Sequence, residues 1–166
     1  MLALSIALAG VLATACSSDA SSASSTSSTA APSAASQLAW LSAHVRQWNA
    51  ALNGDQNAVD TAAAAGSSGS SSTFVKNLET ACSKMLSDVS KAETVPKAPS
   101  ATLQRAWKGM LSATETYATK CLKVAQSGSS SDLTDWQNSL KSMNSASETW
   151  NTAVNAVRTA AGKTSG

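Results

Sequence analysis

A row of aromatic and imidazole side chains could form a recognition surface early in the folded part of the chain. Trp40, His44 and Trp48 follow one another at intervals of four residues, which places all three on one face of an α-helix. Two indoles around an imidazole can contact a sugar, a peptide or a polymer. The row can instead broaden the apolar stripe of its helix with the imidazole at the rim, and the usual packing of amphipathic aromatics favours this second interpretation.

The sequence contains no residue set typical of a catalytic or metal site. His44 is the only histidine, whereas metal sites in helical bundles use several inward carboxylates with Glu-x-x-His pairs. A Ser-His-Asp hydrolase would also have to use His44, and the Gly-x-Ser-x-Gly motif is missing. Thr114 and Ser147 fall at apolar positions, where they can line a small pocket or bond to carbonyls of their own helix. We therefore predict a protein that is not an enzyme and has no catalytic residues, metal or cofactor.

Two cysteines have the positions of a disulfide bond. Cys82 and Cys121 each lie on the apolar stripe of a predicted helix, and these helices flank the proline-containing junction at residues 96–99. A disulfide needs Cα atoms roughly 4.4–6.8 Å apart, which a packed antiparallel helix pair can supply. Counted from the junction, the cysteines are offset by on the order of 13 Å at about 1.5 Å per residue. We therefore expect an extended connection between the helices. The alternative is two buried free thiols.

Four helical segments must position these residues. In each segment apolar side chains recur every three or four residues, as an α-helix requires and a β-strand does not. The segments begin near residues 36, 74, 100 and 132, and the last ends near residue 162. Four helices of similar length joined by modest loops predict an all-α, antiparallel up-down-up-down four-helix bundle with one interhelical disulfide.

Local signals predict where these helices break, begin and end. The Asn-Gly-Asp sequence at residues 53–55 is expected to kink the first helix, because Asn and Gly are poor in helix interiors. Ser72 or Thr73 and then Asp132 are the expected N-caps of the second and fourth helices. The prolines at residues 96–99 end the second helix and open the third.

Composition excludes several classes of partner. The 166 residues carry a formal net charge of +2, and charged residues make up 13% of the chain, about half the usual fraction. Lys and Arg are scattered along the sequence, which argues against a nucleic-acid surface and against a strongly electrostatic partner. Isolated acidic residues with basic neighbours indicate a solvated face; these are Glu79, Asp88, Glu93, Glu115 and Glu148.

The first sixteen residues are almost continuously apolar and end in Ala13-Thr14-Ala15-Cys16. This run is shorter than the roughly 20 residues needed to cross a bilayer core, and it suits the hydrophobic region of a signal peptide. It resembles a bacterial lipoprotein signal, in which small residues precede an obligatory cysteine. The resemblance implies that residues 1–15 are a signal peptide and that Cys16 is lipidated and becomes the mature N-terminus. The alternative is an ordinary secretory peptide cut nearby, which leaves a soluble protein with a spare thiol.

The segment behind Cys16 is expected to be a disordered tether. Residues 16–35 are mainly Ser, Ala and Thr and offer no apolar face to bury. A flexible segment of this length has an end-to-end distance of roughly 25 Å, so it would hold the folded part close to a membrane. The predicted organisation is therefore a signal peptide at 1–15, a lipidated tether at 16–35, a bundle at 36–162 and a disordered tail at 163–166.

These features together predict a non-catalytic interaction or envelope protein, anchored by lipid to the outer face of the cytoplasmic membrane. Its expected partners are the membrane and another envelope protein or polymer, and no nucleic acid. A helical hairpin with one cysteine in each arm also resembles, loosely, small helical lipoproteins of actinobacteria, a resemblance that implies no particular activity. One alternative is a helical-bundle inhibitor of a secreted enzyme. The other is a carrier of a small apolar ligand in the bundle core, lined by Trp107, Trp136, Trp150 and Met110.

Overall fold

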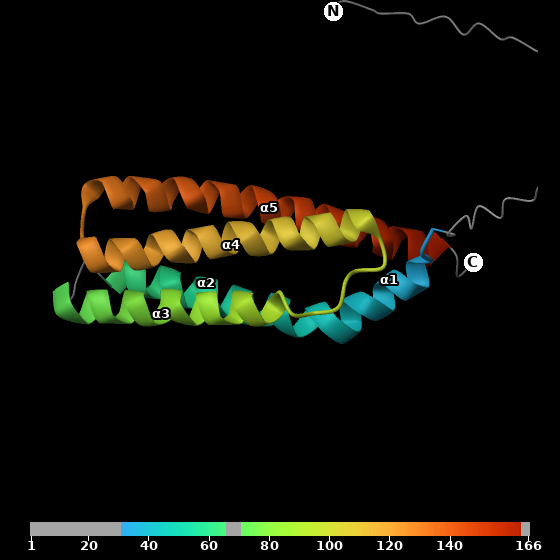
Figure 1. Ribbon diagram of the computed structural model, residues 1–166, viewed down its shortest axis with the longest axis horizontal. Helices are drawn as coiled ribbons and strands as arrows, with labels where there is room; N and C mark the ends of the chain where they lie inside the picture. The colour runs from blue at the N-terminus through green and yellow to red at the C-terminus, as the bar shows by residue number, and fades with distance from the viewer. Residues whose placement is uncertain (1–30, 66–70, 164–166) are drawn as a thin grey trace, which may run out of the picture. The chain divides into compact units, whose positions relative to one another are not determined.

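A computed structural model describes residues 31–65 and 71–163 of the chain (Figure 1). The regular elements of these residues are all helices: α1 (Ala34–Trp40), η1 (Leu41–Val45), α2 (Arg46–Ala65), α3 (Ser71–Ala92), α4 (Ala101–Ser127) and α5 (Ser130–Lys163). Because α1, η1 and α2 follow one another without a gap, they form a single long helix that packs with the other three. The predicted all-α four-helix bundle is confirmed.

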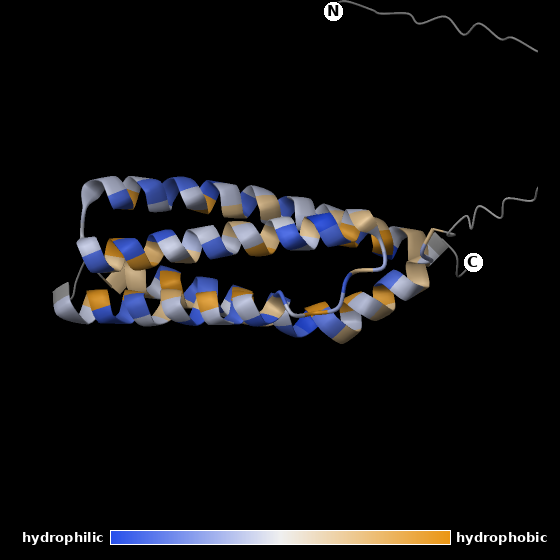
Figure 2. Ribbon diagram, in the orientation of Figure 1, coloured by the Kyte–Doolittle hydropathy of each residue, from blue (hydrophilic) through white to orange (hydrophobic). Residues whose placement is uncertain are grey.

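Hydrophobic side chains fill the interior of the bundle in two clusters. Each helix is amphipathic, and Figure 2 shows hydrophobic and hydrophilic residues alternating along it. One cluster, the tryptophan cluster, is built around Trp40, Trp107 and Trp150, and its members also include Val45, Leu52, Val89, Leu103, Met110, Leu111, Val154 and Val157. The other, the disulfide cluster, includes Val59, Leu78, Cys82, Met85, Tyr117, Cys121, Val124 and Met143. The core therefore has two apolar parts stacked along the bundle axis.

The connection between α3 and α4 is extended, as expected. Residues 96–98 have no helix or turn structure, and Figure 1 shows the link running on past the end of α3 before α4 turns back. The indole Nε1 of Trp40 donates a hydrogen bond of 2.9 Å to the carbonyl of Pro96, which ties the link to the first helix. Because the extended link shifts α4 along the bundle relative to α3, the Cα atoms of Cys82 and Cys121 lie 6.0 Å from each other. The predicted disulfide between them is confirmed.

The predicted kink at residues 53–55 is wrong. Helix α2 runs through Gly54 without interruption, because Leu52, Asp55 and Val59 are all buried on one face and hold this turn against the bundle. The irregular turn is η1, a π-helix in which the Arg46 N–H donates to the Leu41 carbonyl, and the long helix changes direction there (Figure 1).

Several helix ends differ from the sequence prediction by a few residues. Helix α3 already includes Ser72 and Thr73, so neither is its N-cap. Helix α5 begins at Ser130, and its cap is Ser129, whose hydroxyl accepts a hydrogen bond of 3.1 Å from the N–H of Asp132. Asp132 therefore lies inside the first turn. Helix α5 also continues through residue 163, one position into the expected tail.

The expected signal peptide, the Cys16 lipidation site and most of the tether fall within residues 1–30, outside the described residues. None of the described helices contains a stretch long and apolar enough to cross a membrane.

Candidate functional site

The aromatic row lies against the tryptophan cluster. Trp40 is only 6% exposed, and its ring is 6.4 Å from that of Trp107 in an edge-to-face arrangement. Trp48 is partly buried against the same cluster. His44 is half-buried with its ring 6.4 Å from Trp40. The row therefore covers the core, and its three side chains do not form an exposed surface together.

The four side chains expected to line one ligand cavity are divided between the two clusters. Trp107 and Trp150 pack against each other with ring centroids 5.1 Å apart, and Met110 belongs to the same tryptophan cluster. Trp136 instead packs against Tyr117 at 5.7 Å in the disulfide cluster. The indoles fill space on both sides of the bundle's middle, so they do not enclose a shared cavity.

A small cavity does lie between the two clusters, and we call it the waist cavity. Its volume is about 230 Å³, and all three methionines of the described residues line it, one from each of α3, α4 and α5. The complete lining is Asn49, Leu52, Asn53, Gln56, Met85, Met110, Thr114, Met143, Asn144 and Ser147. Thioether, amide and hydroxyl groups therefore surround the cavity, and its lining contains no charged side chain.

One acceptor beside the waist cavity is left without a partner. The Gln56 side-chain N–H group donates to the hydroxyl of Tyr117 at 3.2 Å and to Asp60 at 2.8 Å. Its carbonyl oxygen, Oε1, is buried and has no hydrogen bond within the described part of the chain. The hydroxyl proton of Thr114 is already used, because it donates to the carbonyl of Met110 at 2.9 Å. Oε1 of Gln56 is thus a buried acceptor that can receive a donor from a neutral ligand.

A network of ion pairs joins α2 to α3. Lys84 contacts both Asp55 and Asp88, and Lys91 contacts Asp88 at 3.1 Å. The hydrogen bonds to Asp55 and Asp88 raise the pKa of Lys84, and the hydrogen bond from Lys84 lowers the pKa of Asp88. Both shifts move the group's titration away from neutral pH, the opposite of what a general acid or base requires. The network therefore holds α2 against α3.

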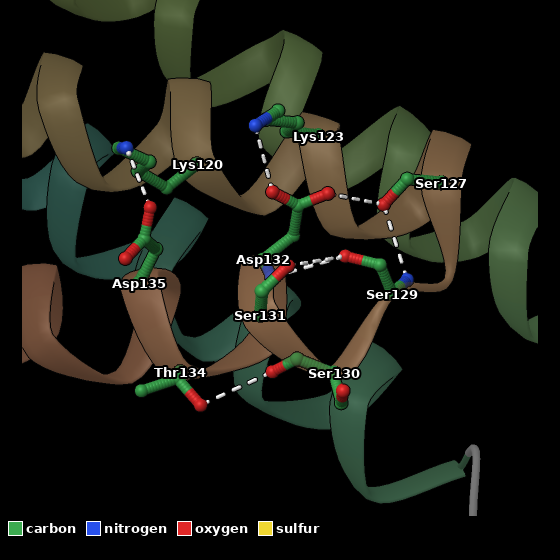
Figure 3. A network of polar contacts seen from close by, with 9 residues as sticks. All are labelled: Lys120, Lys123, Ser127, Ser129, Ser130, Ser131, Asp132, Thr134 and Asp135. Carbon is green, nitrogen blue, oxygen red and sulfur yellow. Dashed lines mark hydrogen bonds and ion pairs between the residues drawn. The ribbon is translucent and has the colours of Figure 1, made fainter.

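A second polar network fixes the turn between α4 and α5 (Figure 3). Asp132 accepts hydrogen bonds from Lys123 at 2.7 Å and from Ser127 at 2.5 Å, and Lys120 pairs with Asp135 at 3.1 Å. The hydrogen bond from Lys123 is the main cause that lowers the pKa of Asp132 to about 2. This carboxylate is therefore ionised at neutral pH, and it braces the turn that aligns α5 against α4.

Nothing in the described residues suggests a metal centre. No three or more His, Cys, Asp and Glu side chains lie close enough together within residues 31–65 and 71–163 to hold an ion. The two later cysteines are fully buried and bonded to each other.

The amides of the first helix that line the waist cavity were not predicted, although the sequence contains a signal for them. Asn49, Asn53 and Gln56 are spaced by four and three residues, so three amides share one face of the first helix. Thr114 and Ser147 were identified as unusual polar residues on apolar stripes, and both line the cavity.

Comparisons with known proteins give no further direction. A scan against protein-family models, a search of curated proteins and a search of solved structures each found no match to this chain. Its function is therefore inferred from its own residues.

Proposed function

We propose that this chain is an exported lipoprotein, held by lipid on the outer face of the cytoplasmic membrane, which acts on another envelope component by binding and without catalysis. The observation that carries the proposal is the bond between Cys82 and Cys121, which joins α3 to α4 inside the core. Structural disulfides persist in oxidising compartments outside the cytoplasm. The lipoprotein-like sequence that ends at Cys16 supports the same compartment independently.

The remaining features fit a binding role. The two polar networks stabilise helix contacts, and their hydrogen bonds raise the pKa of Lys84 and lower the pKa values of Asp88 and Asp132, away from the neutral range that proton transfer needs. A lipid with two acyl chains on Cys16 would supply the stable anchoring that one chain cannot. The Ser/Ala/Thr segment behind it would let the rigid bundle reach partners near the membrane.

Cell fractionation tests the anchor. The full chain expressed in a lipoprotein-processing bacterium should sediment with membranes, be accessible to protease added to intact cells, and incorporate an alkyne-labelled fatty acid. Cys16→Ser should lose the label. A Cys82→Ala/Cys121→Ala variant is the matched control, because it also removes cysteines but should keep the label. Wild-type protein that stays in the cytoplasmic fraction, or a label retained by Cys16→Ser, would contradict the proposal.

The waist cavity supports a second candidate function, the carriage of a small ligand. The sequence suggested an apolar ligand, whereas the cavity walls combine methionine side chains with amides, and the unpartnered Oε1 of Gln56 can accept a hydrogen bond. A small neutral molecule with an N–H or O–H donor and an apolar body fits these walls best.

Native mass spectrometry of the protein purified from its own host tests this function. A bound mass should be present in the wild type and reduced in Gln56→Leu. It should persist in Gln47→Leu, which makes the same change at an exposed position of the same helix. Protein that is recovered consistently without added mass would end the carrier proposal.

A further inference from the structure

We propose that the end of the bundle at which the described chain begins binds the surface of a membrane rich in anionic phospholipid. The first observation is that basic and acidic residues, which are mixed along the sequence, lie mainly in different halves of the folded bundle. Residues 34–52, 89–111 and 150–163, which surround the tryptophan cluster, carry seven Lys or Arg and one acidic residue, a net charge of +6. We call this part the basic half.

The rest of the described bundle has the opposite charge. Residues 53–65, 71–88 and 112–149, which surround the disulfide cluster, carry five Lys and eight acidic residues, a net charge of −3. The chain is nearly neutral as a whole, but the fold gathers residues far apart in sequence into two ends of opposite sign. An electrostatic field of this kind orients a protein on a charged surface.

Two arginines in the basic half flank a groove that suits a phospholipid headgroup. Arg46 on α2 and Arg158 on α5 are both exposed, and they line the same hollow of about 370 Å³. Its walls include the apolar side chains of Leu38, Leu41 and Val154. Guanidinium groups bind phosphate oxygens through paired N–H donors, while apolar walls accommodate the start of an acyl chain.

The charges of these two arginines are not neutralised by the described part of the protein. No Asp or Glu occurs in residues 34–52 or 150–163, and none lines the groove. In the ion pairs within the described residues, the cation is always a lysine and never an arginine. The third arginine differs, because Arg105 shares its hollow between α4 and α5 with Glu148. Of the three arginines, Arg46 and Arg158 are thus the two whose charges remain available to an external anion.

The direction of the chain agrees with this assignment. Helix α1 begins at Ala34, so the segment that leads back to Cys16 joins the bundle at its basic half. If Cys16 carries lipid, as the proposed function holds, the tether delivers this half to the bilayer. The affinity of the groove for anionic lipid rests on the arginines and not on the anchor, so the two proposals can be tested separately.

Vesicle sedimentation tests the inference on the mature-length chain, residues 16–166 with Cys16→Ser, which lacks any lipid of its own. It should bind vesicles that mix phosphatidylglycerol with phosphatidylcholine, bind phosphatidylcholine alone weakly, and lose binding as salt is raised. Each basic residue near an anionic surface contributes about fivefold to binding. The double variant Arg46→Gln/Arg158→Gln should therefore bind the mixed vesicles about 25-fold more weakly.

The matched control is Lys76→Gln/Lys141→Gln, which removes the same charge from exposed positions of the acidic half. It should bind as the wild type does, and circular dichroism should show that both variants fold. Equal losses in the two double variants would overturn the inference, since net charge alone would then explain binding. It would also be overturned by wild-type protein that ignores phosphatidylglycerol, or that prefers soluble polyglutamate or free inorganic phosphate to the mixed vesicles.

Discussion

Replacing Lys84 with methionine should destabilise the protein by about 2 kcal/mol. The reason is the carboxylate of Asp55, which is only 2% exposed and has Lys84 as its ion-pair partner. Removing one partner of a fully buried pair costs roughly 3–5 kcal/mol, and an exposed pair contributes about 0–1 kcal/mol. Lys84 itself is 59% exposed, so water screens the pair and the expected cost falls between these limits.

Urea unfolding followed by tryptophan fluorescence measures this cost. With a slope of about 2 kcal/mol per molar urea, the unfolding midpoint should fall by about 1 M and the slope should stay the same. Lys141→Met is the control for losing an exposed lysine, and it should shift the midpoint little. In an Asp55→Asn background, Lys84→Met should cost less than about 0.5 kcal/mol, because no buried charge is then left unpaired. A Lys84→Met variant as stable as Lys141→Met would show that the buried carboxylate of Asp55 does not depend on Lys84.

Three further predictions concern the staple, the first helix and the α4–α5 turn. Cys82→Ala/Cys121→Ala should lower the free energy of unfolding by roughly 4 kcal/mol, the chain-entropy value for a separation of 39 residues; a loss below about 1 kcal/mol would contradict it. Gly54→Ala should stabilise the protein by about 1 kcal/mol, because α2 is continuous there and the added Cβ meets nothing within 4 Å. Gly128→Ala should destabilise the protein by about 1 kcal/mol, because the φ angle of Gly128 is +63°. Thermal melts of the two variants and the wild type measure both effects. The depressed pKa of Asp132 contributes stability that is fully present above pH 4 and is lost as the pH falls towards about 2. Asp132→Asn should therefore flatten the loss of stability between pH 4.5 and pH 2 in urea titrations, and an unchanged profile would count against the turn network.

The fold could be predicted because its main determinants act over short distances in the sequence. Apolar spacing fixed which face of each helix is buried, and the prolines near residues 96–99 marked the break between α3 and α4. The positions of Cys82 and Cys121 on facing apolar stripes predicted the disulfide, and their unequal distances from that break predicted the extended link. At residues 53–55 low helix propensity led to the wrong prediction of a kink. The cost of about 1 kcal/mol for a glycine inside a helix is smaller than the free energy gained by burying Leu52 and Val59.

The candidate sites could not be predicted in the same way, because they depend on how the helices are arranged. Arg46 and Arg158 lie more than a hundred positions apart in the sequence, and only the packing of α5 against the first helix gives them a shared groove. The scattered charges noted in the sequence therefore say nothing about charge in space. Trp40 and Trp48 adjoin the apolar stripe of their helix, and periodicity alone does not tell the edge of a core from an exposed surface.

The intact mass of the chain purified from membranes of its own host reports on the lipid anchor and the disulfide together. We expect a chain of residues 16–166 that carries a diacylglyceryl group and is lighter by the two hydrogens lost when Cys82 and Cys121 bond. Without reductant, such a protein should not react with maleimide. A chain of residues 1–166 with all three thiols free would contradict both the anchor and the oxidising compartment.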